Sequence, residues 1–253
     1  MIINHADRLA HFLLKKVNRA IREFDMISDG DRVAVALSGG KDSFSLLRIL
    51  EYRLSFAQEK YSLVALHVLG DTRGPDTPSH PPLEAWLRDR GIEFEIRPTL
   101  LSESESLPMP CQRCTWNRRR TLFEMACEKG CNKIAFGHHL DDLAETALMN
   151  LIHHGRNETM APVGDYLCGR LKLIRPMIYV PERELKGFAA ACQFPPPPPL
   201  CPLGAANQRS RIKYLLGELK KENRRASSNL VRAAFREMGL GSSRENPGEK
   251  TNA

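Results

Sequence analysis

The stretch "VAVALSGGKDSFSLL", residues 33–47, sets two adjacent glycines between an apolar run and a segment with helical spacing. Residues 33–37 predict a buried strand, while Phe44 and Leu47 begin the apolar face of a helix. The glycine turn therefore lies where a parallel strand ends and a helix begins. Because the first N–H groups of a helix lack partners and the helix dipole is positive there, the turn predicts a site for an anion such as phosphate.

The residue types of this turn suit a phosphate ligand. Glycines let the backbone come close to a bound group, a lysine supplies positive charge, and two serines supply hydroxyl donors. The turn is not a Walker P-loop, because Val35 and Asp42 stand where that motif has a glycine and a serine or threonine. A tight turn with a serine cap is the alternative, but it has no need of a lysine followed by an acid. The predicted contacts are Ser38, Gly39, Gly40, Lys41, Asp42 and Ser43.

Further apolar runs recur at helix-sized intervals, at residues 63–68, 92–96, 133–136 and 171–178. Between most of them lie segments with a helical period, such as "SFSLLRILEYRL" and "RTLFEMACEKG". Strands that alternate with helices predict an α/β fold, in which helices cover both faces of a doubly wound parallel sheet.

Prolines and composition divide the chain. The run "FPPPPPLCP" predicts a stiff extended connector, because proline fixes φ and cannot continue a helix. The last residues hold too few apolar side chains to pack, which predicts disorder. We expect an N-terminal helix at residues 1–24, an α/β domain at 25–194, a connector with basic helices at 195–240 and a disordered tail at 241–253.

Composition and charge predict a soluble protein with a polyanionic partner. Apolar residues make up 42% and charged residues 26% of the chain, as in ordinary globular proteins. No run approaches the length that spans a bilayer, and the first residues favour an amphipathic helix over a signal peptide, so we expect a cytoplasmic protein that does not enter a membrane. The net charge is +7, and basic residues gather at 205–237, which favours a nucleic acid over a merely solvated helix face.

A second polar cluster, "FGHHLDDLAET" at residues 136–146, also follows a strand and opens a helix. His138 and His139 bring imidazoles to this strand end, and Asp141 and Asp142 bring carboxylates, which can hold Mg²⁺ on the phosphates of ATP. Helix capping is the alternative for either acid. The sequence leaves open which of the two aspartates meets the metal.

The cysteines form one spaced set and a remainder. Cys111 and Cys114 in "PCQRCTWNRRR" are spaced so that both sulfurs can point at one metal, and Cys201 follows the proline run. Three thiolates fit an iron–sulfur cluster with one open iron, or a zinc site completed by a histidine, and unrelated free cysteines are the alternative. We expect core or structural roles for Cys127, Cys131, Cys168 and Cys192.

In combination and order these motifs resemble the iron–sulfur tRNA thiolases of the ATP pyrophosphatase (PP-loop) superfamily, most closely the tRNA 2-thiocytidine synthetase branch. The resemblance covers roughly residues 30–236 and rests on "SGGKDS", "CQRC", "GHHLDDLAET", "IRPMIYVPERE" and Cys201. It implies an adenine nucleotide alpha hydrolase-like fold and a 4Fe–4S cluster on Cys111, Cys114 and Cys201, whose fourth iron binds the sulfur to be transferred. The chain lacks the CxxC zinc ribbons of the related 2-thiouridine enzymes, which favours the thiocytidine branch.

The resemblance also implies an enzyme and its chemistry. ATP adenylates the 2-oxo group of a tRNA base, expected to be a cytidine of the anticodon loop, and sulfur from sulfide or a persulfide carrier then replaces the oxygen. Lys41, Asp42 and Asp142 are the predicted catalytic residues, with Mg²⁺ as a cofactor. The predicted ATP contacts outside the glycine turn are His67, Gly137, His138 and Asp142.

Basic side chains outside the nucleotide motifs are the predicted RNA contacts, namely Arg118, Arg119, Arg120, Arg209 and Arg211. Trp116 could stack on a base, although a core position is more usual for tryptophan. We expect a homodimer only because symmetric dimers are common. The rival interpretations are a lysidine-forming type of tRNA ligase with a structural zinc, and a non-catalytic RNA-binding relative.

Overall fold

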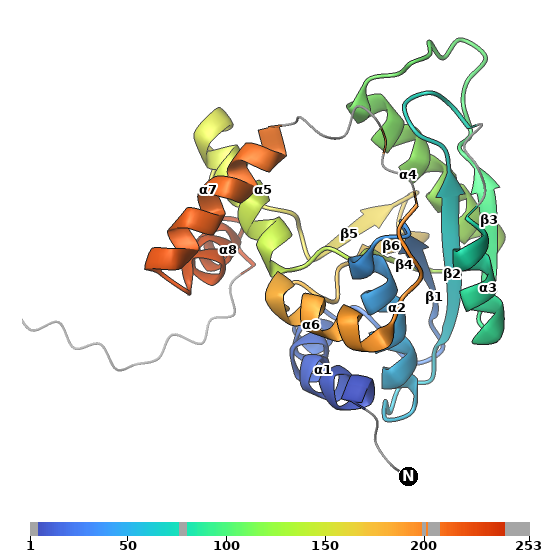
Figure 1. The fold of residues 1–253 in the computed structure, drawn as a ribbon, viewed down its shortest axis with the longest axis horizontal. Helices are drawn as coiled ribbons and strands as arrows, with labels where there is room; N and C mark the ends of the chain where they lie inside the picture. The colour runs from blue at the N-terminus through green and yellow to red at the C-terminus, as the bar shows by residue number, and fades with distance from the viewer. Residues whose placement is uncertain (1–4, 76–79, 199–200, 202–207, 241–253) are drawn as a thin grey trace, which may run out of the picture.

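The structure, a computed structural model, describes residues 5–75, 80–198, 201 and 208–240 (Figure 1). One six-stranded sheet has the order β3-β2-β1-β4-β6-β5, and every pair of neighbours is parallel except β5 and β6. The α/β class and the doubly wound sheet are therefore confirmed. The strands are β1 (Arg32–Leu37), β2 (Ser62–Leu69), β3 (Glu93–Pro98), β4 (Lys133–Ala135), β5 (Val163–Tyr166) and β6 (Leu171–Ile174).

Helices cover both faces of the sheet. Alternate residues of a strand point to opposite faces, so Val33 and Val35 enter the core with α1, α2, α3, α5 and α6, while Ala34 enters a smaller core with α4. The helices are α1 (His5–Glu23), α2 (Lys41–Leu54), α3 (Pro81–Asp89), α4 (Cys111–Glu128), α5 (Leu140–His154), α6 (Glu182–Cys192), α7 (Gln208–Glu222) and α8 (Ala226–Glu237).

The order of the strands decides where a ligand can bind. From β1 the chain moves through β2 to β3 on one side of the sheet, and β4 then pairs with the other side of β1. The carboxyl ends of β1 and β4 thus meet at a switch point, which is where open α/β sheets bind ligands. The glycine turn follows β1, and the segment "GHHLDD" follows β4.

Two details of the sheet differ from the expected runs. The run 171–178 forms a strand only as far as Ile174, because Pro176 has no N–H to continue the pairing. The antiparallel edge strand β5 was not predicted, since its sequence "VGDY" lacks an apolar pattern. Because β5 lies at the edge and pairs only with β6, the parallel part of the sheet is as expected.

The C-terminal helices form a separate layer beside the sheet. α7 and α8 pack against α5, and residues 195–198 follow α6 without forming helix or strand (Figure 1). The tail predicted at 241–253 lies outside the described residues. Among the helices that the structure describes, none has the length and apolar character needed to cross a membrane.

Candidate active site

The glycine turn is held in shape by its own serines. The Ser43 hydroxyl accepts from the backbone N–H of Ser38 at 3.1 Å and donates to the carbonyl of Gly40 at 2.9 Å. Gly39 has φ of +80°, a conformation that glycine adopts without strain. Gly40 is the N-cap of α2 and offers no side chain to cap it, so the N–H groups of the first turn are left for an anion.

The segment after β4 forms the facing wall. His139 and Asp142 make a capping box at the start of α5, in which Asp142 Oδ2 accepts from the His139 N–H at 3.0 Å. A Cβ on Gly137 would lie 3.1 Å from the backbone of Asp42 and Ser43, so glycine is needed for this close packing. The two predicted motifs therefore pack directly on one another.

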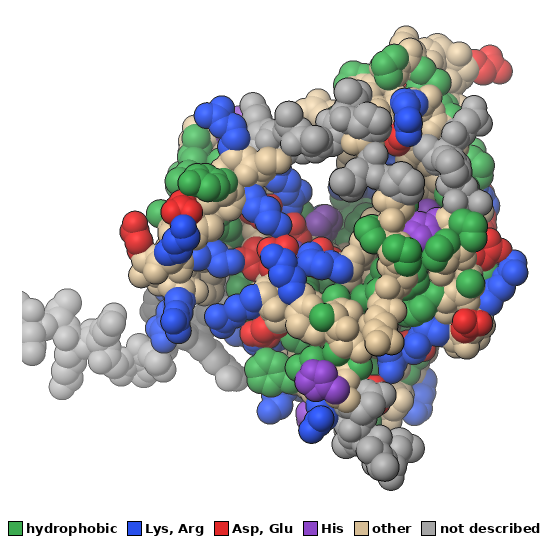
Figure 2. Space-filling model, in the orientation of Figure 1, with side chains coloured by type: hydrophobic (Ala, Val, Ile, Leu, Met, Phe, Trp, Pro, Cys, Tyr) green, Lys and Arg blue, Asp and Glu red, His purple; other side chains and the backbone are tan. Residues whose placement is uncertain are grey.

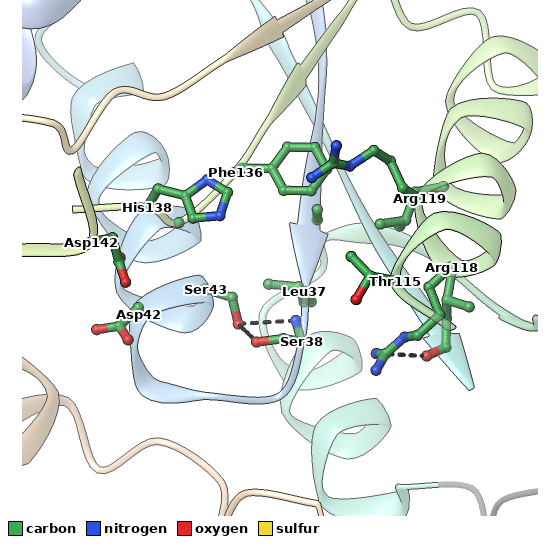
Figure 3. A pocket seen from close by; sticks show the side chains of 14 residues that line it. Leu37, Ser38, Asp42, Ser43, Thr115, Arg118, Arg119, Phe136, His138 and Asp142 are labelled. Atoms are coloured by element: carbon green, nitrogen blue, oxygen red, sulfur yellow. Dashed lines mark hydrogen bonds between the residues drawn. The ribbon is translucent and has the colours of Figure 1, made fainter. Parts of the chain in front are cut away.

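Between them lies an open pocket of about 370 Å³ (Figure 3). Asp42 and Asp142 lie on one side, Arg118 and Arg119 project from α4 on the other, and the turn serines lie between. An anionic ligand thus meets two guanidinium groups, while the carboxylates can face a cation that it carries. The remaining lining is mostly apolar, from Ala36, Leu37, Val68, Leu122 and Phe136.

His138 enters this pocket as a neutral imidazole. Its ring stacks on Phe136 with centroids 5.8 Å apart, and its Nδ1 accepts from Arg175 Nε at 3.2 Å. Burial, together with the charge of Arg175, lowers the pKa of His138 to about 4. At neutral pH the ring therefore has one proton, on Nε2, where it can donate to a ligand.

The structure gives different surroundings to Asp141 and Asp142, between which the sequence could not choose a metal ligand. Asp141 is buried and accepts from three groups, the Glu182 N–H at 2.7 Å, Ser227 Oγ at 2.8 Å and Lys220 Nζ at 2.5 Å. It thereby ties α5 to α6, α7 and α8. Asp142 instead lines the pocket, so Asp142 is the better candidate for a metal-bound phosphate.

Lys41 forms ion pairs at the edge of the site. Its ammonium lies 3.0 Å from Asp42 and 3.3 Å from Glu182, which also pairs with Lys213 at 3.1 Å. Sequence reasoning did not single out Glu182 or Arg175, although both fall inside the quoted segment "IRPMIYVPERE". Neither residue belongs to a recognisable local pattern, and only the fold brings Arg175 to His138 and Glu182 to Lys41.

The Glu182 carboxylate should make the stability of the fold depend on pH in the acid range. Burial disfavours its charge, but the hydrogen bond from Lys213 and the charges of Lys41 and Lys186 outweigh burial and lower its pKa to about 2. A pKa below the unfolded value of 4.5 adds stability above pH 4.5 that is lost as pH falls toward 2. We expect Glu182→Gln to be less stable than wild type by about 2 kcal/mol at pH 7, with the difference vanishing near pH 2. Parallel curves of unfolding free energy against pH would contradict this.

Other predicted contacts lie at varied distances from the pocket. Arg118 donates to the Val68 carbonyl at 3.3 Å and the Arg119 guanidinium lies 6.0 Å from the Phe136 ring, so both line the pocket. Arg120 pairs with Glu124 on the exposed side of α4, and Arg211 is exposed on α7. These two are not brought to the pocket.

Arg209 reaches back to the site. It donates to Asp142 at 2.7 Å and to Glu145 at 3.0 Å, which links α7 to the nucleotide wall. Figure 2 shows charged side chains of both signs and a histidine at the edge of a hollow on this face. As an RNA contact Arg209 stays a prediction.

His67 and Trp116 differ from what their sequence context suggested. His67 is buried beside Leu37, whose carbonyl lies 2.8 Å from Nδ1, so it supports the end of β1 and does not line the pocket. Trp116 is 51% exposed, with the Arg113 guanidinium 4.7 Å from its ring, so the usual core position is wrong here. It is available for stacking.

The spaced cysteines lie near one another at one end of α4. Cys111 and Cys114 occupy its first turn, and burial raises the pKa of the Cys114 thiol, with Arg118 opposing and the Cys201 and Cys111 thiols adding to the rise. Thr72 lies between Cys201 and the start of α4. Its hydroxyl is 3.3 Å from Cys201 Sγ, and the Thr72 carbonyl accepts from the N–H of Met109, two residues before α4, at 2.7 Å.

The remaining cysteines only partly fit the expected core roles. Cys131 is buried and Cys192 is half-buried, but Cys127 and Cys168 are exposed. Cys127 lies in the last turn of α4 and faces solvent, and Cys168 sits in the turn between β5 and β6. The spacing of these cysteines did not reveal which helix face or turn they occupy.

Comparison with known proteins assigns the family. The sequence model of the PP-loop domain family matches residues 11–194. The tRNA-cytidine(32) 2-sulfurtransferase of Geobacter sulfurreducens is 41% identical over 224 residues, which is 86% of each chain. This chain belongs to the tRNA-cytidine(32) 2-sulfurtransferase family of PP-loop proteins. The relative from Citrifermentans bemidjiense is 39% identical over 86% of this chain and 87% of its own.

A solved structure supports the same assignment. The U34-tRNA thiolase NcsA from Methanococcus maripaludis, solved with its 4Fe-4S cluster, matches 92% of this chain and 81% of its own length, at a TM-score of 0.72 and 25% identity. The resemblance to the tRNA thiolases and the prediction of a tRNA-thiolating enzyme are thus confirmed at the level of the 2-sulfurtransferase family. The roles of individual residues stay predictions.

Thiolates such as those of Cys111, Cys114 and Cys201 can bind either the irons of a cluster or a zinc ion. Within residues 5–75, 80–198, 201 and 208–240, no three His, Cys, Asp or Glu side chains converge tightly enough to bind one metal ion. In a 4Fe–4S cluster each thiolate binds a different iron, so neighbouring but separate thiols suit it.

Proposed function

We propose that this protein is an ATP-dependent thiolase that replaces the 2-oxo group of cytidine 32 in tRNA with sulfur. The position follows the names of its relatives. The observation that carries the proposal is the placement of α4. Thr115 and Arg119 on this helix line the nucleotide pocket, and Cys111 and Cys114 open the same helix. Adenylation and sulfur delivery would thus occur at neighbouring points.

The pocket accounts for ATP. The apolar lining suits an adenosine, and the uncapped N–H groups at the start of α2 suit its phosphates. Mg²⁺ would bind through Asp142 and the phosphates, because Asp142 lines the pocket whereas Asp141 is buried among three donors of the fold. Lys41 pairs with Asp42, which lines the pocket, so its ammonium group is at the edge of the site. It would turn toward the phosphates of bound ATP and stabilise the pyrophosphate that leaves.

The proposed reaction takes place in two steps. The 2-oxo oxygen attacks the α-phosphorus of ATP, the bond from that phosphorus to pyrophosphate breaks, and an O-adenylated base remains. A sulfide equivalent then adds to C2, the C2–O bond breaks, and AMP leaves with the former base oxygen. Cys111, Cys114 and Cys201 would hold a 4Fe–4S cluster, which when bound supplies an open iron for sulfide. His138, as a neutral imidazole, and the positively charged Arg119 would orient the adenylate.

The surface around the cysteines suits RNA. Anticodon-loop bases are already unstacked, so one can enter a pocket without melting a duplex. The exposed Trp116, with Arg113 beside its ring, offers a stacking surface two residues beyond Cys114. Arg120 and the exposed basic residues of α7 and α8 lie outside the pocket and would hold backbone phosphates. We also propose that sulfur comes from sulfide or a persulfide carrier, and that the protein is a cytoplasmic homodimer.

The direct test is thiolation in vitro. Anaerobically purified protein with ATP, Mg²⁺, sulfide and a tRNA transcript should yield 2-thiocytidine in the digested RNA, measured by mass spectrometry. A transcript with cytidine 32 replaced by uridine is the control and should stay unmodified. Product without ATP, or the same yield from both transcripts, would contradict the proposal. AMP release that requires an amine would instead indicate a tRNA ligase of the lysidine-forming type.

A further inference from the structure

Residues 194–198, which we call the strap, leave the end of α6 and cross the nucleotide-binding end of the sheet on the way to Cys201. The strap begins with Phe194, which stacks on Phe44 of α2 with centroids 5.4 Å apart. The ring also meets Trp86 of α3 edge-on at 5.9 Å and Phe188 of α6 at 6.2 Å. Three helices thus hold the start of the strap by aromatic packing.

A histidine holds the middle of the strap. His80 Nε2 lies 2.8 Å from the carbonyl of Pro196, and its Nδ1 accepts from the Leu83 N–H at 3.2 Å, which caps α3. Because Nδ1 is the acceptor in the cap, Nε2 has the proton and donates to the strap. His80 is buried and Pro196 is exposed, so this hydrogen bond is partly shielded from water.

The end of the strap rests on the glycine turn. A Cβ on Gly39 would lie 2.6 Å from Cδ and 2.9 Å from Cγ of Pro198. Gly39 does not line the nucleotide pocket, whereas Ser38 and Asp42 beside it do. The turn thus contacts the strap through one face and lines the pocket with the other, and its glycine is needed as much for the strap as for phosphate.

Cys201 follows the strap in the sequence, and its thiol lies beside Thr72. The Thr72 hydroxyl is 3.3 Å from Cys201 Sγ, and the backbone of Thr72 is bonded to the segment that leads into Cys111. Prolines lock φ, so a chain anchored at Phe194, Pro196 and Pro198 has little freedom left three residues later. A flexible connector would leave that thiol to find its partners by diffusion.

We infer that the strap is a positioning element, anchored by His80 and Phe194, which fixes Cys201 opposite Cys111 and Cys114 and so determines how firmly the cysteine site holds its metal. The inference rests on the proposed function in that the metal is the iron of a cluster. It assigns a role to two residues outside the sequence motifs, one before α3 and one after α6.

The test separates the anchor from the helix cap. In His80→Asn, asparagine still caps α3 but is too short to reach Pro196, so the strap alone is released. We expect iron to leave the anaerobically purified variant about fivefold faster under a chelator, as for the loss of one part-buried hydrogen bond. Phe194→Ala should release iron faster still. Phe56→Ala, which removes an aromatic ring that is 64% exposed at the far end of α2, should match wild type.

A second readout works without any metal. In cluster-free protein, the rate at which iodoacetamide alkylates Cys201 is compared with that of the exposed Cys127 in the same sample, by peptide mass spectrometry. His80→Asn should raise this ratio about fivefold, while the ATP affinity stays within about threefold of wild type. Unchanged iron release and unchanged alkylation in both anchor variants would overturn the inference. Wild-type protein without iron would refute the cluster instead, and the alkylation ratio would still test the strap.

Discussion

Asp142→Asn is expected to lower thiolation by about 100-fold or more while leaving the fold intact. Asparagine keeps a side-chain oxygen that can accept from the His139 N–H, so the start of α5 stays capped. The pocket, however, loses the carboxylate that would hold Mg²⁺ on the phosphates. The loss of such electrostatic stabilisation lowers kcat by about 100-fold to 1,000-fold. AMP release per tRNA measures the step directly, and a variant with more than a tenth of wild-type activity would exclude this role.

Asp141→Asn is the matched control, because it makes the same chemical change one residue earlier. Asp141 is buried with three donors around it, and a neutral amide cannot satisfy all three. We expect a loss of about 2 to 3 kcal/mol of stability, seen as a Tm about 5 °C lower or more, with AMP release within about fivefold of wild type at 20 °C. If both variants lost activity and stability alike, the division of labour between the two acids would be wrong.

Local patterns predicted the elements that position the pocket. The strand, the glycine turn and the first turn of α2 form one continuous signal, in which five apolar residues end at a pair of glycines. The same logic placed "GHHLDD" after β4. Because parallel strands end at one edge of a sheet, two such signals suffice to predict that the motifs meet.

Contacts between distant segments could not be predicted in the same way. Arg175 meets His138 and Glu182 meets Lys41 because β6 pairs with β4 and α6 follows, and no spacing in the sequence states that register. Likewise, the exposure of Trp116 depends on which face of α4 packs on the sheet, and the cysteine spacing does not set that face. The strap contact between Pro198 and Gly39 joins residues 159 positions apart (198 − 39).

Replacing any one of Cys111, Cys114 and Cys201 by alanine is expected to remove the iron and to lower thiolation at least about 100-fold. Wild-type protein purified without oxygen should contain about four iron atoms and about four acid-labile sulfides per chain. A cluster left with two thiolates exchanges its ligands and falls apart. Cys127→Ala, in the last turn of the same helix, is the control and should keep both metal and activity. Iron that survives all three substitutions would show that the cluster ligands lie elsewhere.

The cysteine variants and Asp142→Asn should fail in opposite ways, and this contrast tests the two-site arrangement itself. Cys111 and Cys114 lie at the start of α4 and Cys201 lies beside Thr72, all outside the nucleotide lining, so their loss should leave ATP affinity within about threefold of wild type. Asp142 lies on the other wall, so its variant should keep its iron while losing AMP release. If the cysteine variants also lost ATP binding, the two sites would form one cooperative unit, and the strap, which contacts Gly39 and precedes Cys201 in the sequence, would be the first place to seek the coupling.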